Sequence, residues 1–204
     1  MLALLVALVV AGVATYYFTS SSAPKEAVEA ALVYIEAVKK GDFERVFKYH
    51  GPSQKRRFLI ILKGGSEMED YLDSLYRTQK ASFENARPPQ SLTGAWGWME
   101  KFLFLPSGRF EVVDVTMRRH EENVSLPLQN INVRYYAVVT VRATYPEKER
   151  APRIAGKPLK SALLDITMVH SSNIARTLRG KITIDRWLFY SLSVRDDSIE
   201  YWQD

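Results

Sequence analysis

INVRYYAVVTVR, residues 131–142, alternates apolar and polar side chains with a period of two. Its odd-numbered positions carry Ile, Val, Tyr, Ala, Val and Val, while Asn, Arg, Tyr, Val, Thr and Arg stand between them. Successive side chains of a β-strand point to opposite faces of the sheet, so one face of this segment is expected to be buried. The stretch therefore predicts a strand with one face in a hydrophobic core.

Three further segments predict strands by their β-branched and aromatic content, namely residues 110–117, 163–170 and 181–194. The connections at 121–129 and 145–158 contain prolines, which oppose regular pairing. Residues 96–105 fit either a strand or a short helix. Long consecutive strands joined by hairpin-length connections indicate an antiparallel sheet.

The residues before this sheet have helical periodicity. Pro24 suits the first turn of a helix, and an apolar stripe follows from Val28 to Val38. Gly41 is placed to end that helix, and Asp42 can cap a short second helix over residues 43–49, closed by Gly51 and Pro52. Helices followed by strands predict an α+β domain.

Two more helices are expected between residues 53 and 84. Ser53 can cap the first, and Gly64-Gly65 should end it. Ser66 to Glu69 match the S-x-x-E capping box, which predicts the start of the next helix. Its apolar face should carry Met68, Tyr71, Leu72 and Leu75.

The first 18 residues contain no charged side chain. At about 1.5 Å per residue they would span roughly 27 Å, close to the ~30 Å of a bilayer core. One interpretation is a cleaved signal peptide, but the segment lacks the usual Lys or Arg before its apolar run. The favoured interpretation is a retained single-pass transmembrane anchor at 1–18, a linker at 19–23 and a globular domain at 24–204.

Small residues in this anchor would allow close approach to other membrane helices. They fall approximately on one face: Ala3, Ala7, Ala11 and Ala14. Tyr16, Tyr17 and Phe18 stand where an aromatic belt would meet the lipid headgroups. Membrane lipid and other membrane-protein subunits are therefore the expected partners. The expected localisation is the membrane. The side of the globular domain stays open: Lys25, close to the end of the anchor, favours the cytoplasmic side by the positive-inside rule, whereas N-anchored bacterial domains favour the extracytoplasmic side, which is the preferred alternative.

Composition excludes several classes of protein. The chain has 204 residues and no cysteine, so it has no disulfide scaffold, thiolate metal site or cysteine nucleophile. Its 28 basic and 23 acidic residues give a net charge of +5. Only residues 55–57 and 118–120 form short basic clusters, so no nucleic-acid partner is expected.

PKEAVEAALVYIEAVKKGDFE, residues 24–44, resembles the start of domains in the nuclear transport factor two-like, or ketosteroid-isomerase-like, superfamily. There, a first helix ends in a K-x-G-D-F/Y-E turn, and the last strand often carries a Trp followed by apolar residues, as at 187–190 here. The resemblance implies a cone-shaped domain whose strongly curved antiparallel sheet wraps helices around a pocket. The superfamily includes isomerases, adaptors and anchored bacterial proteins, so a bacterial chain is expected but no particular activity.

Catalysis of the isomerase kind would need a carboxylate base beside an apolar cavity, with a Tyr or protonated Asp donating to the developing enolate. The candidates in predicted elements are Asp114, Asp165, Asp185, Tyr34, Tyr76, Tyr135 and Tyr136. Their spacing matches no catalytic pattern, and the alternative is that they lie at the surface. His50, His120 and His170 lack metal-ligand spacing, and His50 is expected at a helix end that favours positive charge. No catalytic residue, cofactor or metal is therefore expected.

Tyr201 and Trp202 lie close to the last residue of the sequence. An exposed Tyr-Trp pair is unfavourable, so the segment either folds back on the domain or docks a partner. Taken together, the sequence predicts a non-catalytic, membrane-anchored binding or scaffold domain, an accessory subunit of a larger membrane complex. The alternatives are a solitary anchored domain that binds an apolar small molecule, and a pocket isomerase or dehydratase.

Overall fold

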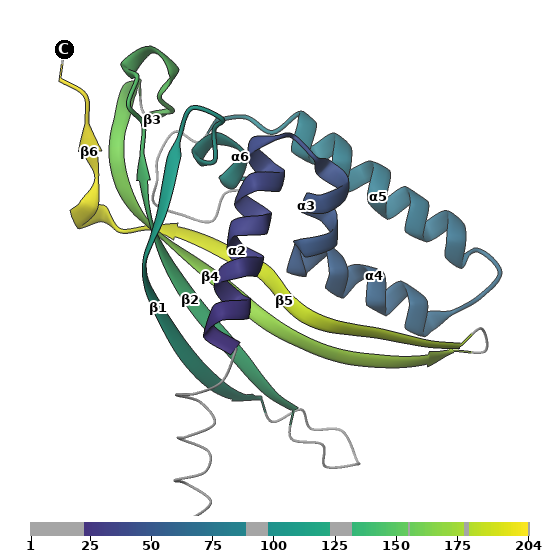
Figure 1. Ribbon diagram of the computed structural model, residues 1–204. Helices are drawn as coiled ribbons and strands as arrows, with labels where there is room; N and C mark the ends of the chain where they lie inside the picture. The colour runs from purple at the N-terminus through teal and green to yellow at the C-terminus, as the bar shows by residue number, and fades with distance from the viewer. Residues whose placement is uncertain (1–22, 89–97, 123–131, 155, 178–179, 204) are drawn as a thin grey trace, which may run out of the picture.

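The computed structural model describes residues 23–88, 98–122, 132–154, 156–177 and 180–203. It shows an α+β fold, as the sequence predicts, with helices packed against one face of a curved antiparallel sheet (Figure 1). The helices are α2 (Ala23–Lys39), α3 (Phe43–Tyr49), α4 (Gly51–Lys63), α5 (Met68–Glu84) and α6 (Glu100–Leu103). The strands are β1 (Arg109–Glu122), β2 (Asn132–Thr144), β3 (Arg153–Ile154), β4 (Lys157–Thr177), β5 (Gly180–Val194) and β6 (Glu200–Tyr201).

Strand β4 organises the six-stranded sheet of the described chain. It pairs antiparallel with β2, β3, β5 and β6, and β2 pairs in turn with β1. At 21 residues β4 is much longer than the predicted 163–170, and with β5 it forms a hairpin that runs beside α4 (Figure 1). A register shift between Thr167 and Met168 leaves Tyr190 as an extra residue in β5.

The inner face of the sheet forms the core together with α2. The alternation predicted for β2 is confirmed at Ala137, Val139 and Val141, each with an exposed fraction of 0%. The facing side chains of α2 include Ala31, Tyr34 and Ile35, which are also buried. Leu32 belongs to the predicted stripe but is 37% exposed, because it lies at the edge of the packed face.

The junction between α2 and α3 forms as predicted. Gly41 takes a left-handed backbone with φ of 64°, a conformation that favours glycine after a helix. Asp42 then caps α3, its carboxylate accepting a 3.1 Å hydrogen bond from the Arg45 backbone N–H. This tight turn places the end of α3 against β5.

Three local predictions are wrong. Gly51 and Pro52 do not close a helix but begin α4, since Pro52 fits the first turn, so Ser53 lies inside the helix rather than capping it. The capping box also fails, because α5 begins one residue later than it requires and Glu67 holds the cap position. Pro158 lies within β4, where its partner is the two-residue strand β3 at the sheet edge.

No helix in the described part of the chain combines the length and apolar character needed to cross a bilayer. The predicted anchor at 1–18, with Ala3, Ala7, Ala11, Ala14 and its aromatic residues, lies outside the described residues. Most of the predicted linker does too, although α2 already begins at Ala23. The anchor therefore stays a prediction.

Candidate functional site

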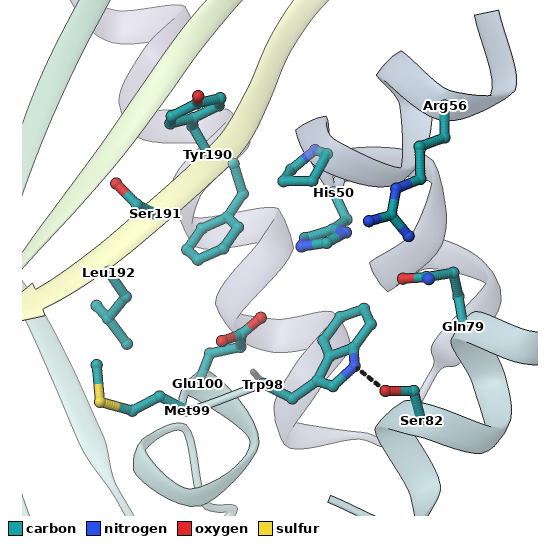
Figure 2. A pocket seen from close by; sticks show the side chains of 12 residues that line it. His50, Arg56, Gln79, Ser82, Trp98, Met99, Glu100, Tyr190, Ser191 and Leu192 are labelled. Carbon is teal, nitrogen blue, oxygen red and sulfur yellow. Dashed lines mark hydrogen bonds between the residues drawn. The ribbon is translucent and has the colours of Figure 1, made fainter. Parts of the chain in front are cut away.

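A pocket of about 440 Å³ lies among the starts of α4 and α6, the C-terminal part of α5 and strand β5. It combines aromatic, apolar and hydrogen-bonding side chains (Figure 2). The lining residues are His50, Pro52, Arg56, Gln79, Ser82, Trp98, Met99, Glu100, Phe189, Tyr190, Ser191 and Leu192. Segments far apart in the sequence thus build one cavity on the helical side of the sheet.

His50 stands between α3 and α4, where its backbone forms an isolated parallel bridge with Phe189 of β5. The next residue must be small, because a Cβ on Gly51 would lie 2.8 Å from the Phe189 carbonyl oxygen. The imidazole Nδ1 lies 2.7 Å from Ser53 Oγ, which in turn donates to Gln79 Oε1 at 3.3 Å. A backbone contact and a hydrogen-bond chain therefore fix this ring in the pocket wall.

The imidazole of His50 is uncharged at neutral pH. Burial, and secondly the positive charge of Arg56, lower its pKa to about 4. The sequence-based expectation of a positive charge at this helix end is wrong. His50 does lie at a helix end, as the C-cap of α3, but it also precedes the N-terminus of α4, so the two helix dipoles act on its charge in opposite directions and burial and Arg56 decide the outcome. Its ring packs against Trp98 with 4.6 Å between centroids.

Trp98 packs against His50, and the two rings together form an aromatic wall of the pocket. The Trp98 backbone has a φ of 62°, unusual for a bulky residue, and no other described non-glycine residue has a positive φ. Ring contacts with Phe43 and Phe83, and a 3.1 Å hydrogen bond from Nε1 to Ser82 Oγ, hold the indole in place. Backbone strain of this kind persists only where the surrounding packing maintains it, and it concentrates at functional sites.

Glu100 places a carboxyl group at the buried end of the pocket. Its exposed fraction is 4%, and Figure 2 shows the group directed into the cavity near His50 and Trp98. Tyr34 of α2, fully buried and stacked on Phe189 at 4.2 Å, donates a 2.9 Å hydrogen bond to Oε1. Burial raises the pKa of the Glu100 carboxyl, while its own backbone N–H and the Tyr34 hydroxyl act in the opposite direction.

Arg56 supplies a cation at the mouth of the pocket. Its side chain extends from α4 toward His50 and Gln79 (Figure 2), and the residue is exposed. It has no ion-pair partner in the described part of the chain. The pocket therefore has a cationic rim, an aromatic wall and an acidic inner end.

The acidic residues considered from sequence lie elsewhere. Asp114 is exposed and accepts a hydrogen bond from Thr116, and Asp185 is exposed and lies 3.4 Å from the His170 imidazole. Asp165 lies on the outer sheet face beside Arg195. None of the three lines the pocket, so an isomerase site built on them is not supported.

Asp165 belongs to a structural network. Two hydrogen bonds of 2.9 Å join it to the Arg195 guanidinium, and Thr140 donates to it at 2.7 Å. Partial burial acts to raise the pKa of Asp165, but the hydrogen bonds from Arg195 and Thr140 outweigh it and lower that pKa. The network fastens β4 to the segment after β5.

The remaining sequence candidates are dispersed. Tyr76 packs edge-on against Phe43 and Phe47, and Tyr135 and Tyr136 are half-buried on β2. The side chain of His120 lies outside the described residues. No group of three or more His, Cys, Asp or Glu within the described ranges could hold a metal ion.

Tyr201 and Trp202 fold back on the domain, the first of the two alternatives. Tyr201 of β6 pairs with Leu159 of β4, and Trp202 donates from Nε1 to the Tyr145 carbonyl oxygen at 3.2 Å. Both side chains are half-buried against the core. Docking of a partner on their exposed parts stays a prediction.

Sequence analysis missed Glu100, Trp98 and Arg56 as site residues. One signal was present: Glu100 and Lys101 are the only charged residues between Trp96 and Leu105, an otherwise apolar segment. A carboxylate there must either reach solvent or be buried with a partner, and its partner, Tyr34, lies 66 positions away.

Comparison of the chain with family models, with curated proteins and with solved structures gives no significant match.

Proposed function

We propose that the domain binds a small molecule in the pocket between α4, α5, α6 and β5. The observation that carries this proposal is the Glu100 carboxyl, which is directed into a cavity large enough for a small organic ligand and bounded by His50 and Trp98. This pocket mixes polar and apolar side chains. The ligand we propose is accordingly an amphiphile, rather than the apolar small molecule that was one of the alternatives from sequence.

A purely structural role accounts poorly for Glu100. Burying a carboxyl group is costly unless it is well paired, and the only side chain that donates to it within the described chain is the neutral Tyr34 hydroxyl. A glutamine could make the same hydrogen bond at lower cost. Retention of an acid with a perturbed pKa in a cavity is typical of a functional site.

The wider setting of this function is also a proposal. The curved antiparallel sheet, the helices on its inner face and the α2–α3 turn support a cone-shaped member of the nuclear transport factor two-like superfamily. The uncharged segment at 1–18 supports a single-pass anchor and an accessory role in a membrane complex, in which the pocket would serve as a binding module. Mild detergent extraction tests this: a complex predicts a defined large particle, weakened by Ala7→Leu.

The binding proposal is tested by blocking the pocket. Leu192 lines the cavity from β5, and its neighbour Ser193 is exposed and lines no part of it. Leu192→Trp should abolish the stabilisation that small amphiphiles give in a thermal-shift screen of the full chain, and Ser193→Trp should retain it. Equal loss in both variants, or no stabilising compound for the wild type, would refute the proposal.

A second candidate is an enzyme that transfers protons. The observation favouring it is again Glu100, whose raised pKa suits a general acid or base beside the neutral His50 imidazole. Isomerisation or dehydration of a bound ligand should then fall by about 10²-fold or more in Glu100→Gln, with binding retained. Equal turnover in the variant and the wild type would exclude it.

A further inference from the structure

Arg56 and Glu100 differ in what they can offer a ligand. Arg56 carries a permanent positive charge at the exposed mouth of the pocket. Glu100 lies at the closed end, 4% exposed, with one oxygen already accepting from Tyr34. A molecule that lies along the pocket would meet a cation at one end and a carboxyl group at the other.

The aromatic wall between them favours a flat, apolar body. His50 and Phe189 have nearly parallel rings, 24° apart, with 6.0 Å between centroids. Leu192 and Met99 add aliphatic surface. Planar rings gain contact area against such surfaces, whereas a strongly hydrated sugar would leave them poorly covered.

From these three parts we infer that the pocket is built for a hydroxylated aromatic monoanion, with its anionic group at Arg56, its ring beside His50 and Trp98, and its hydroxyl at Glu100. This inference rests on the proposed binding function and specifies its ligand class. A hydroxyl fits the inner end because it can donate to a carboxylate or accept from a carboxylic acid. A second anionic group there would face the Glu100 carboxyl and be disfavoured.

The electrostatics of the rim agree with this orientation. The charge of Arg56 contributes to the lowered pKa of His50, so its field reaches into the pocket. The first turn of α4, including Pro52 of the lining, adds the partial positive charge of a helix N-terminus. No carboxylate in the described chain pairs with Arg56 and would have to be displaced.

The test uses three fluorescent probes with the full chain in nonionic detergent: 6-hydroxy-2-naphthoate, its neutral amide, and 2-naphthoate. The hydroxy acid should bind about 10-fold more tightly than either analogue, since each analogue loses one polar contact. Arg56→Gln should weaken the hydroxy acid about 10-fold and the amide less than 2-fold. Arg57→Gln is the matched control, because Arg57 is an exposed neighbour outside the pocket, and it should change neither affinity.

Equal affinity of the acid and the amide, or equal effects of Arg56→Gln and Arg57→Gln, would overturn the inference. If both probes then still lose binding in Leu192→Trp, the pocket binds small molecules and only the ligand class is wrong. If no probe binds the wild-type chain, the ligand class is also refuted, and the proposed binding function is decided by the wider thermal-shift screen.

Discussion

Acidification should destabilise the domain through His50. Its pKa is about 4 in the folded chain, against 6.5 for an ordinary histidine. The unfolded chain therefore binds a proton more readily over this window, so stability falls as the pH drops from 6.5 toward 4. A difference of about 2.5 pH units corresponds to about 3 kcal/mol at 1.36 kcal/mol per unit.

Glu100 contributes with the opposite sign. Its pKa is raised in the folded chain, so the folded state binds the proton more tightly and gains stability as the pH falls through the window above 4.5. The stability of the wild type at any one pH therefore contains the contributions of both His50 and Glu100. Variants that remove one group at a time separate them.

The assay is urea unfolding of the full chain in nonionic detergent at pH 7 and pH 4, followed by circular dichroism. In His50→Gln the loss between the two pH values should be smaller than in the wild type by about 3 kcal/mol. In Glu100→Gln the loss should be larger than in the wild type. A pH dependence in His50→Gln equal to that of the wild type would refute the assignment of a half-buried, neutral imidazole.

Three further predictions concern stability and are measured by urea unfolding at pH 7. Gly51→Ala should cost about 1–3 kcal/mol, because the new Cβ would lie 2.8 Å from the Phe189 carbonyl oxygen; an unchanged midpoint would show that this contact is not tight. Tyr34→Phe should lower the free energy of unfolding by about 1–3 kcal/mol, because it leaves the Glu100 carboxyl without its side-chain donor, and Glu100→Gln in the same chain should recover part of the loss; purely additive effects would contradict a direct pair. Asp165→Asn should lower the free energy of unfolding by only about 0.5–1 kcal/mol, since the Asp165–Arg195 pair is partly exposed; a loss several times larger would contradict a partly exposed network.

The sequence predicted the elements whose causes are local. The alternation at 131–142 reports directly which side chains of β2 face the core, because the strand repeat is fixed by backbone geometry. The roles of Gly41 and Asp42 were predictable for the same reason. Gly41 supplies a left-handed turn, and Asp42 caps α3 by accepting a hydrogen bond from the backbone N–H three residues later.

The pocket could not be predicted in this way because its causes are long-range. Glu100 is buried beside Tyr34 of α2, which donates a hydrogen bond to it, and Trp98, with its positive φ, is packed against Phe43, Phe83 and His50. Gly51 was predicted to end a helix because the local sequence does not show that β5 passes close to its backbone. Asp114, Asp165 and Asp185 were candidates only because they fall in predicted strands, and none of them lines the pocket.

The most direct test of small-molecule binding is a two-dimensional NMR titration of the full chain labelled with ¹⁵N-tryptophan, using 6-hydroxy-2-naphthoate and a fragment library. Trp98 lines the pocket, whereas the described tryptophans Trp187 and Trp202 do not, so their indole N–H signals serve as internal controls. The Trp98 signal, assigned with Trp98→Phe, should shift with saturation, and those of Trp187 and Trp202 should stay in place. Absence of any saturable Trp98 shift across the library, or equal shifts of the Trp98, Trp187 and Trp202 signals among the four that the chain gives, would contradict a ligand-binding pocket at this site.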